Sequence, residues 1–344
     1  MFKMELVTRN SDGLKNFYDD EGRILFKKWL SYVSEPDGRL IRIQRAEDKL
    51  WNIIRDDGVL ISRDWFEKID EFSNGYALVK LEDKGYNFID RNGIFLCSRF
   101  YVELSSFDEN GFAAVKKKDR YNFIDMKGKY VFSEWLLKFE RSKGDVKRIQ
   151  RQDGLWNIVD PQMRVLSKRW FTFITPFSDG IAEVKRTSPN EAWSYLHEDG
   201  RLLTDTWFAS VDNFYGQNGF ARVQRAKDKH YNFIKSDGKL VGRRWFKYAS
   251  FLIYSGLAKV QREDDKYNFV GIDGNPISEI WFDDVDDFVD GFAMVHDEGL
   301  VNFIDTSGKI VLDNWYSSAK SFEDGVVAVK IDKDKWFRIN LHLA

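Results

Sequence analysis

The chain has 344 residues, of which 43% are hydrophobic and 16% aromatic, so it can bury a substantial core. Its 53 basic and 55 acidic residues give a net charge of −2, which provides no overall field that would attract nucleic acid or a membrane. The one cysteine, Cys97, cannot form an intramolecular disulfide, and no stretch approaches about 18 apolar residues. We therefore expect a soluble, cytoplasmic protein without a signal peptide or transmembrane segment.

A short motif with an aromatic residue followed by Asn, Phe, Ile and Asp recurs along the chain, for example at 86–90 and 121–125. Its asparagine position, which we call the anchor, returns every 34 to 38 residues. The anchors are Asn16, Asn52, Asn87, Asn122, Asn157, Ser194, Asn232, Asn268, Asn302 and Phe337. This spacing predicts one array over residues 1–344, with nine complete repeats and one partial repeat of about 35 residues.

Each repeat reads as three β-strands, taken in chain order in the third repeat. Strand a covers 75–80 and alternates between small or β-branched residues and variable ones, which indicates one packed and one tolerant face. A connector rich in Lys and Asp leads to strand b at 86–90. A tight turn ends at Gly93, six residues after the anchor, and strand c follows.

A large aromatic residue stands thirteen positions after each of the first nine anchors, and an aliphatic residue stands nine positions after each. We expect these aromatic side chains to form the structural core, because a single repeat buries too little apolar surface and must stack on its neighbours. On this basis Trp245→Ala should cost about 3 to 5 kcal/mol. The tryptophans are Trp29, Trp65, Trp135, Trp170, Trp207, Trp245, Trp281 and Trp315, and Phe100 takes the place in the third repeat.

The repeats resemble the WG (KWG) repeats of bacterial and bacteriophage proteins. Residues 180–185 closely fit the family's Gly-Leu-Ala-x-Val-Lys, and 155–160 closely fit its Lys-Trp-Gly-Phe-Ile-Asp, with Asn157 at the position of the glycine. Asparagine tolerates a left-handed backbone, and its side chain can also satisfy neighbouring backbone groups. Hydrogen bonds between the stacked asparagines of adjacent repeats are the alternative that we prefer. The resemblance implies a repeat scaffold and supplies no catalytic residue.

An all-β tandem array of three-stranded units can be built in two ways. We expect an open, curved or superhelical array, since nine to ten units of about three strands do not fit a typical propeller. A closed, propeller-like toroid is the alternative.

The tolerant face of strand a is the best candidate for a binding surface. The last strand position and the variable positions beside it would align through stacking into a polar, partly basic row that could bind a partner, although solvated side chains would give the same pattern. The row contains Lys80, Lys116, Lys185, Arg222, Gln224, Lys259 and Gln261, with the acidic Glu183 at one variable position.

Catalytic, metal and cofactor sites are not expected. The four histidines fall in different repeats without ligand spacing, and the acidic cluster of Asp283, Asp284, Asp286, Asp287 and Asp290 reads as a solvated loop. The first hypothesis is therefore a non-catalytic scaffold that binds another protein. A glycan-binding module with exposed aromatic residues is the alternative, and a hydrolase using these carboxylates is a weaker one. The oligomeric state is open.

Overall fold

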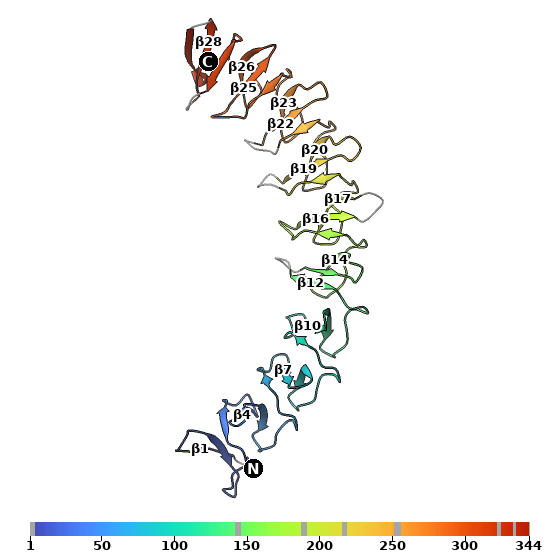
Figure 1. Cartoon of the computed structure of the whole chain (residues 1–344), viewed down its shortest axis with the longest axis vertical. Helices are drawn as coiled ribbons and strands as arrows, with labels where there is room; N and C mark the ends of the chain where they lie inside the picture. The colour runs from blue at the N-terminus through green and yellow to red at the C-terminus, as the bar shows by residue number, and fades with distance from the viewer. Residues whose placement is uncertain are drawn as a thin grey trace. The chain divides into compact units, whose positions relative to one another are not determined.

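The computed structural model describes residues 4–141, 146–186, 191–214, 219–250, 256–321, 325–332 and 335–343. Strands dominate these residues, and the only helix among them is a short 3-10 helix at Leu341–Leu343. The chain divides into two compact halves, residues 1–165 and 166–344, and each half is a series of small sheets that follow one another in chain order (Figure 1). The all-β fold of repeated units is confirmed. The single array and its open or closed form stay predictions.

The N-terminal half contains one five-stranded and three three-stranded antiparallel sheets in its described part. Its strands are β1 (Glu5–Thr8), β2 (Lys15–Tyr18), β3 (Leu30–Val33), β4 (Leu40–Arg45), β5 (Trp51–Arg55), β6 (Lys68–Ile69), β7 (Tyr76–Leu81), β8 (Gly85–Asp90), β9 (Glu103–Leu104), β10 (Phe112–Lys117), β11 (Arg120–Asp125), β12 (Lys138–Arg141), β13 (Lys147–Gln150) and β14 (Trp156–Val159).

The C-terminal half contains five three-stranded sheets in its described part. Its strands are β15 (Phe173–Ile174), β16 (Ile181–Arg186), β17 (Ala192–His197), β18 (Ser210–Val211), β19 (Phe220–Gln224), β20 (Tyr231–Lys235), β21 (Tyr248–Ala249), β22 (Ala258–Gln261), β23 (Tyr267–Val270), β24 (Asp284–Val285), β25 (Phe292–Asp297), β26 (Leu300–Asp305), β27 (Ser318–Ser321), β28 (Val326–Asp332) and β29 (Lys335–Asn340).

Each three-stranded sheet is a meander of a short strand, strand a and strand b. In the sheet β6-β7-β8, strand a is β7 and strand b is β8, as the alternation predicts. The third strand is not the predicted strand c that follows the turn. It is the two-residue strand β6, sixteen and seventeen positions after the anchor, which pairs with strand a of the next repeat. The segment after the turn forms only isolated bridges with strand b, such as Ile89 with Phe95.

A loop of constant length starts at strand b. It ends at the residue that directly follows the predicted core aromatic, fourteen positions after the anchor. In the second repeat Trp51 and Phe66, one position before and fourteen after the anchor, exchange both backbone hydrogen bonds at 2.7 and 2.9 Å. The same pair of bonds joins Tyr86 to Tyr101 and Tyr267 to Phe282. Insertions inside this loop would break its closing bridge, which explains why the repeat varies in length only outside it.

The anchor asparagine lies at the centre of this loop. The Nδ2 of Asn52 donates to the carbonyl oxygens of Ser62 and Asp64, both at 3.0 Å, and its Oδ1 accepts from the backbone N–H of Ile53 at 2.7 Å. Asn87 and Asn268 repeat this pattern at the same offsets. All eight anchor asparagines are at most 1% exposed. The amide therefore satisfies backbone groups that would otherwise be buried without partners.

The left-handed backbone and the bonds between stacked asparagines are both wrong, whereas the predicted ability of the anchor side chain to satisfy neighbouring backbone groups is confirmed. None of the anchor asparagines has a positive φ angle, and in the repeats of Asn52, Asn87 and Asn268 their bonds stay within one repeat instead of joining stacked asparagines. A planar amide can donate twice and accept, which suits a loop with several inward carbonyls. Ser194 takes the place with one hydroxyl, 3.1 Å from the carbonyl of Thr206. Asn232 keeps only the bond from Phe233, and its Nδ2 has no hydrogen-bond partner within the described ranges.

The turn glycine six residues after the anchor packs against the preceding repeat. A Cβ added to Gly93, Gly238 or Gly308 would overlap the carbonyl of the aliphatic residue nine positions after the previous anchor, and all three glycines have φ between 80° and 84°. The two constant features of the sequence, glycine and aliphatic residue, thus contact each other between repeats. Met163 replaces glycine in the fifth repeat and keeps the positive φ angle, at 60°.

The predicted core tryptophans lie at the margin of the core and not in its centre. All eight are half-buried, whereas the residue that follows, fourteen positions after the anchor, is at most 3% exposed in eight of the nine repeats. Successive residues of an extended segment point to opposite sides. Because the closing bridge turns Phe66 or Phe282 inward, the tryptophan before it points toward the edge. The core itself is shared between neighbouring repeats, as where Phe66 packs with Val79 and Ile89.

The expectation for Trp245→Ala is revised accordingly. Phe246 is 3% exposed within a core cluster, whereas Trp245 is half-buried beside Arg225. Phe246→Ala should cost about 3 kcal/mol, and Trp245→Ala about 1 to 2 kcal/mol. Urea unfolding of the two variants measures the difference. A larger loss of unfolding free energy for Trp245→Ala than for Phe246→Ala would contradict this placement and support a central core position for the tryptophan.

Candidate functional site

The predicted binding row lies on one face of the strands a. Its last-position side chains stand beside the aromatic residue that precedes each anchor, because these residues are register partners: Lys80 with Tyr86, and Lys185 with Trp193. The Nζ atoms lie 5.9 and 5.6 Å from the ring centroids. Each lysine thus has an aromatic wall on the side of strand b.

The lysines of the row are paired with carboxylates. Lys80 binds Glu67, Lys116 binds Glu103 at 2.6 Å, and Lys185 binds Glu191 at 2.5 Å. The hydrogen bond to its glutamate raises the pKa of Lys116. The basic members of the predicted polar, partly basic row are therefore largely neutralised by carboxylates of the same chain.

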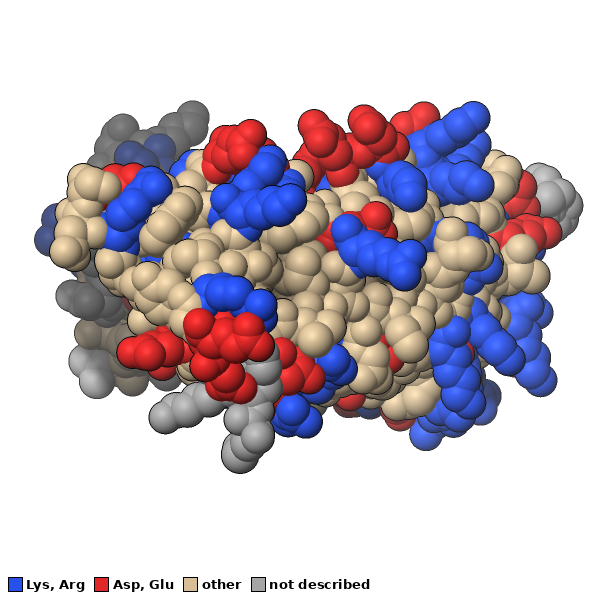
Figure 2. Space-filling model, turned by 90° about the horizontal axis from the view of Figure 1, so that it is seen from below, with Lys and Arg blue, Asp and Glu red and all other residues tan. Residues whose placement is uncertain are grey.

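The other members of the row bind backbone. The Nε2 of Gln224 donates to the carbonyl of Lys229 at 2.9 Å, and that of Gln261 to the carbonyl of Asp265 at 3.3 Å, so both hold their connectors. Arg222 and Lys259 reach the next sheet, where they donate to the carbonyls of Ala249, at 2.6 Å, and Val285. Basic and acidic side chains are interspersed on the face seen in Figure 2, and neither sign covers it.

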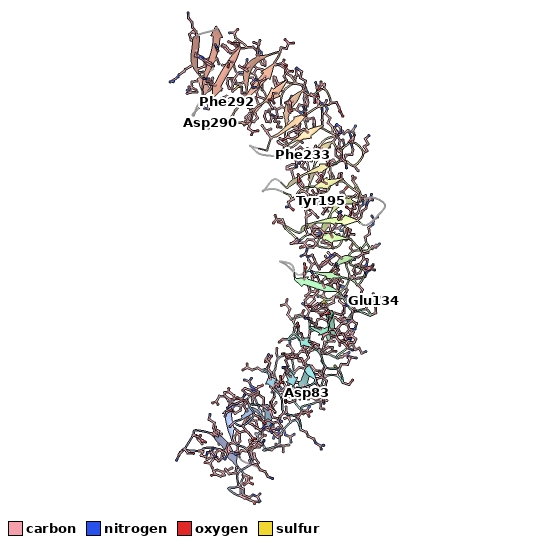
Figure 3. All side chains as sticks on the ribbon, in the orientation of Figure 1. Asp83, Glu134, Tyr195, Phe233, Asp290 and Phe292 are labelled. Atoms are coloured by element: carbon pink, nitrogen blue, oxygen red, sulfur yellow. The ribbon has the colours of Figure 1, made fainter. Side chains whose placement is uncertain are left out.

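Three grooves occur at equivalent places between neighbouring repeats. Their volumes are about 500, 440 and 340 Å³, within the range typical of ligand pockets. Each is lined by the middle residue of strand a, by the residue after the next anchor and by the loop that follows the short strand. Figure 3 labels Tyr195 in the second groove, and Asp290 and Phe292 in the third.

The middle residue of strand a gives each groove a different chemistry. It is Arg42 in the first groove, Glu183 in the second and Met294 in the third. In the first groove Arg42 binds Glu71 at 2.9 Å and Arg91 binds Asp37 at 2.8 Å. The backbone around the grooves is thus repeated while the side chain at the middle of strand a varies. Surfaces that discriminate between partners combine features in this way.

The sequence interpretation missed an aromatic residue that stands twenty positions after five of the anchors in the described part of the chain. These residues are Phe72, Phe107, Phe177, Phe214 and Phe288, of which Phe72, Phe177 and Phe214 line the first and second grooves. Three of them pack on the aromatic residue that directly follows the anchor: Phe107 stacks on Phe88 at 4.4 Å between centroids, Phe214 lies 4.8 Å from Tyr195, and Phe288 lies 4.6 Å from Phe269. The constant offset of twenty was the signal that could have revealed them.

Arginine side chains cover several of the half-buried tryptophans. The guanidinium carbon lies 4.0 Å from the ring centroid for Arg45 over Trp65 and 4.4 Å for Arg262 over Trp281. Arg9, Arg186 and Arg225 cover Trp29, Trp207 and Trp245 in the same way. Such cation–π contacts occupy the ring face that a sugar would need for stacking.

The acidic cluster of the eighth repeat does not converge on a site. Asp283 binds Lys266 at 2.7 Å, Asp284 binds Lys259 at 3.1 Å, and the hydrogen bond from Lys266 lowers the pKa of Asp283. In the ranges that the structure describes, no three His, Cys, Asp or Glu side chains are placed to hold a metal ion. Nor do these ranges contain a helix long and apolar enough to cross a membrane.

A family model described as "WG containing repeat" matches residues 66–84 and 303–336. Two segments of this chain therefore match WG repeats. The first matched segment runs from the buried Phe66 through β7, and the second from the residue after the anchor Asn302 to Trp336 in β29. The first match thus includes a strand a, and the second includes both the loop that follows an anchor and a strand a.

No curated protein matches the WG-repeat chain. Among solved structures, BamB from Moraxella catarrhalis is similar at 14% identity, covering 79% of this chain and 89% of BamB, with a TM-score of 0.25. A eukaryotic initiation factor is similar at 9% identity, covering 92% of this chain and 97% of the factor, with a TM-score of 0.31. At such TM-scores these similarities carry no argument about function.

Proposed function

We propose that this WG-repeat chain is a non-catalytic scaffold that binds another protein, of the bacterial or bacteriophage type that the resemblance implies. The observation that carries this proposal is the set of equivalent grooves whose middle residue is Arg42, Glu183 or Met294. A periodic frame with varied contacts suits an extended polypeptide, which presents side chains at regular intervals. A cytoplasmic location is part of the proposal, because a single cysteine suits a reducing compartment.

The glycan alternative receives less support. Tyr32, Phe173 and Tyr248 are 42 to 45% exposed and could stack on a sugar. The tryptophans that motivated this alternative, however, are half-buried, and arginine covers five of them. A hydrolase would need one carboxyl with a raised pKa beside one that stays ionised, and the cluster at 283–290 supplies lysine-bound carboxylates instead.

Site-specific photo-crosslinking in cells tests the proposal. A benzoylphenylalanine residue would replace Ser34 or Ser178, which line two different grooves, or Ile94 or Ile272, which are exposed turn residues. We expect one protein to crosslink from both groove positions and from neither turn. The purified partner should then crosslink to the purified chain with the same pattern.

Two outcomes would contradict the proposal. One is the absence of a specific protein crosslink from either groove. The other is binding of the purified chain on a glycan array that Tyr248→Ala abolishes, because Tyr248 lies outside all three grooves.

A further inference from the structure

The middle position of strand a carries a paired basic residue in several repeats. Arg42 binds Glu71 at 2.9 Å, Arg222 binds Asp212 at 2.8 Å and Lys259 binds Asp284 at 3.1 Å. Arg148 likewise binds Glu140. Each cation therefore meets an acidic partner supplied by this chain.

Glu183 reverses the charge at this position. Its backbone follows the common pattern, since its N–H donates to the Oγ1 of Thr175 at 2.9 Å. Its half-buried carboxylate has no hydrogen-bond or ion-pair partner in the described parts of the chain. Burial raises the pKa of Glu183, and the charge of the nearby Asp212 raises it further. The groove thus holds a half-buried carboxylate without a cationic partner, near an aspartate that is itself bound to Arg222.

The equivalent site in the next repeat shows what this arrangement lacks. There the guanidinium of Arg222 lies 5.1 Å from the centroid of Tyr231, binds Asp212 at 2.8 Å and donates to the carbonyl of Ala249 at 2.6 Å. A carboxylate at position 183 can make none of these donor contacts. A cation from outside could make them in its place.

The walls of the second groove suit a planar cation on an aliphatic stem. The groove has a volume of about 440 Å³ and is bounded by Phe177, Tyr195 and Phe214. Tyr195 is fully buried and donates its hydroxyl to the carbonyl of Asp212 at 2.6 Å, so this wall is fixed. Aromatic faces stack on guanidinium groups, and a carboxylate accepts two of their N–H bonds.

We infer that the groove at Glu183 binds an arginine side chain of the partner protein. The guanidinium donates to the carboxylate of Glu183 and stacks on Phe214, the half-buried aromatic wall, and the stem contacts Phe177. This inference rests on the proposed function and adds the chemistry of one contact. Lysine, a point charge without a planar fork, binds less tightly in the same place.

Peptide titration of the full chain tests the inference. The probe is the acetylated, amidated tripeptide Gly-Arg-Gly, and its citrulline counterpart is the neutral control; binding is followed by NMR shifts of the Tyr195 and Glu183 amides. We expect arginine to bind at least tenfold more tightly than citrulline, and Glu183→Gln to weaken arginine binding at least tenfold. The matched variant Glu279→Gln, at an exposed residue outside this groove, should leave it unchanged. Equal binding of arginine and citrulline, or an unaffected Glu183→Gln variant, overturns the inference.

A stability measurement separates loss of the contact from loss of the fold. The pKa of Glu183 is higher in the folded than in the unfolded chain. The protonated side chain therefore adds to the free energy of unfolding below about pH 4, and this stabilisation is lost as the pH rises through the folded-state pKa. Glu183→Gln has no such loss, so its melting temperature should exceed that of the wild type at pH 7 and approach it near pH 4. Asp212 and Tyr195, the titratable groups that interact electrostatically with Glu183, and Arg222, which binds Asp212, are unchanged in the comparison. A lower melting temperature at pH 7 would reveal an internal partner for Glu183 and overturn the inference.

The outcomes also separate this inference from the proposed function. A crosslinked protein partner whose affinity is indifferent to Glu183→Gln contradicts the arginine site alone. Arginine binding that depends on Glu183, without any protein crosslink from the grooves, contradicts the proposed function alone.

Discussion

Gly238→Ala should cost about 4 kcal/mol of unfolding free energy. Gly238 has a φ angle of 83°, which costs an alanine about 1 to 2 kcal/mol. In addition, the new Cβ would overlap the carbonyl oxygen of Leu203 in the preceding repeat. Moving two packed backbones apart adds about 1 to 3 kcal/mol. Urea unfolding followed by tryptophan fluorescence measures the loss.

Gly291→Ala is the matched control in the same half of the chain. Gly291 has a φ angle of 88°, but an added Cβ would meet no atom within 4 Å. It should therefore lose only the conformational part, about 1 to 2 kcal/mol. The difference between the two variants measures the close approach of neighbouring repeats. Equal losses would mean that the turn glycines serve their own turns and not the stacking.

Asn268→Ala should cost about 5 kcal/mol. The substitution leaves the carbonyls of Ser278 and Ile280 and the backbone N–H of Phe269 without their partner, which now lies 2.9, 2.8 and 2.7 Å away. A buried polar group without a partner costs about 1 to 3 kcal/mol, and three are affected. Unfolding in urea gives the loss directly.

Two further variants make this prediction specific. Asn268→Ser should fall between the wild type and alanine, because one hydroxyl can reproduce the single role that Ser194 performs. Asn275→Ala, at an exposed turn position where the side chain bonds only to Asp273, should change stability by less than about 0.5 kcal/mol. A loss at Asn275 as large as that at Asn268 would refute a special role for the anchor.

The repeat, its strands a and b and its turns could be predicted from the sequence because each has a local cause. Alternation marks β7 and β16, and Asp90 with Gly93 marks a turn whose φ angle only glycine adopts readily. The third strand could not be predicted. It has two residues, and it forms only because the next strand a lies beside it.

The roles of Asn87 and Trp245 needed the three-dimensional structure. A sequence shows that asparagine recurs, but its partners are backbone carbonyls ten and twelve residues away, and any residue type can supply those. Trp245 and Phe246 are both large and aromatic, and only the closing bridge decides which one points inward. Lys116 and Lys185 find carboxylates on different elements, so no constant offset marks their pairing.

Function follows the same division between constant and variable positions. The loop closed by the anchor fixes the backbone, and the middle of strand a then varies from Arg42 to Glu183 to Met294 without loss of the frame. A binding partner would contact those side chains in the grooves. The account therefore depends first on the anchor loop being a rigid frame.

Hydrogen exchange of the asparagine side-chain amides tests that frame in the unaltered protein. Samples labelled with ¹⁵N in asparagine would resolve the amides of Asn52, Asn87 and Asn302, which are at most 1% exposed, from those of the exposed turn residues Asn92 and Asn275. The account predicts that the anchor amide protons exchange at least a hundredfold more slowly than the turn amides, since a locked loop must open first. Anchor amides that exchange as fast as the turn amides would contradict it.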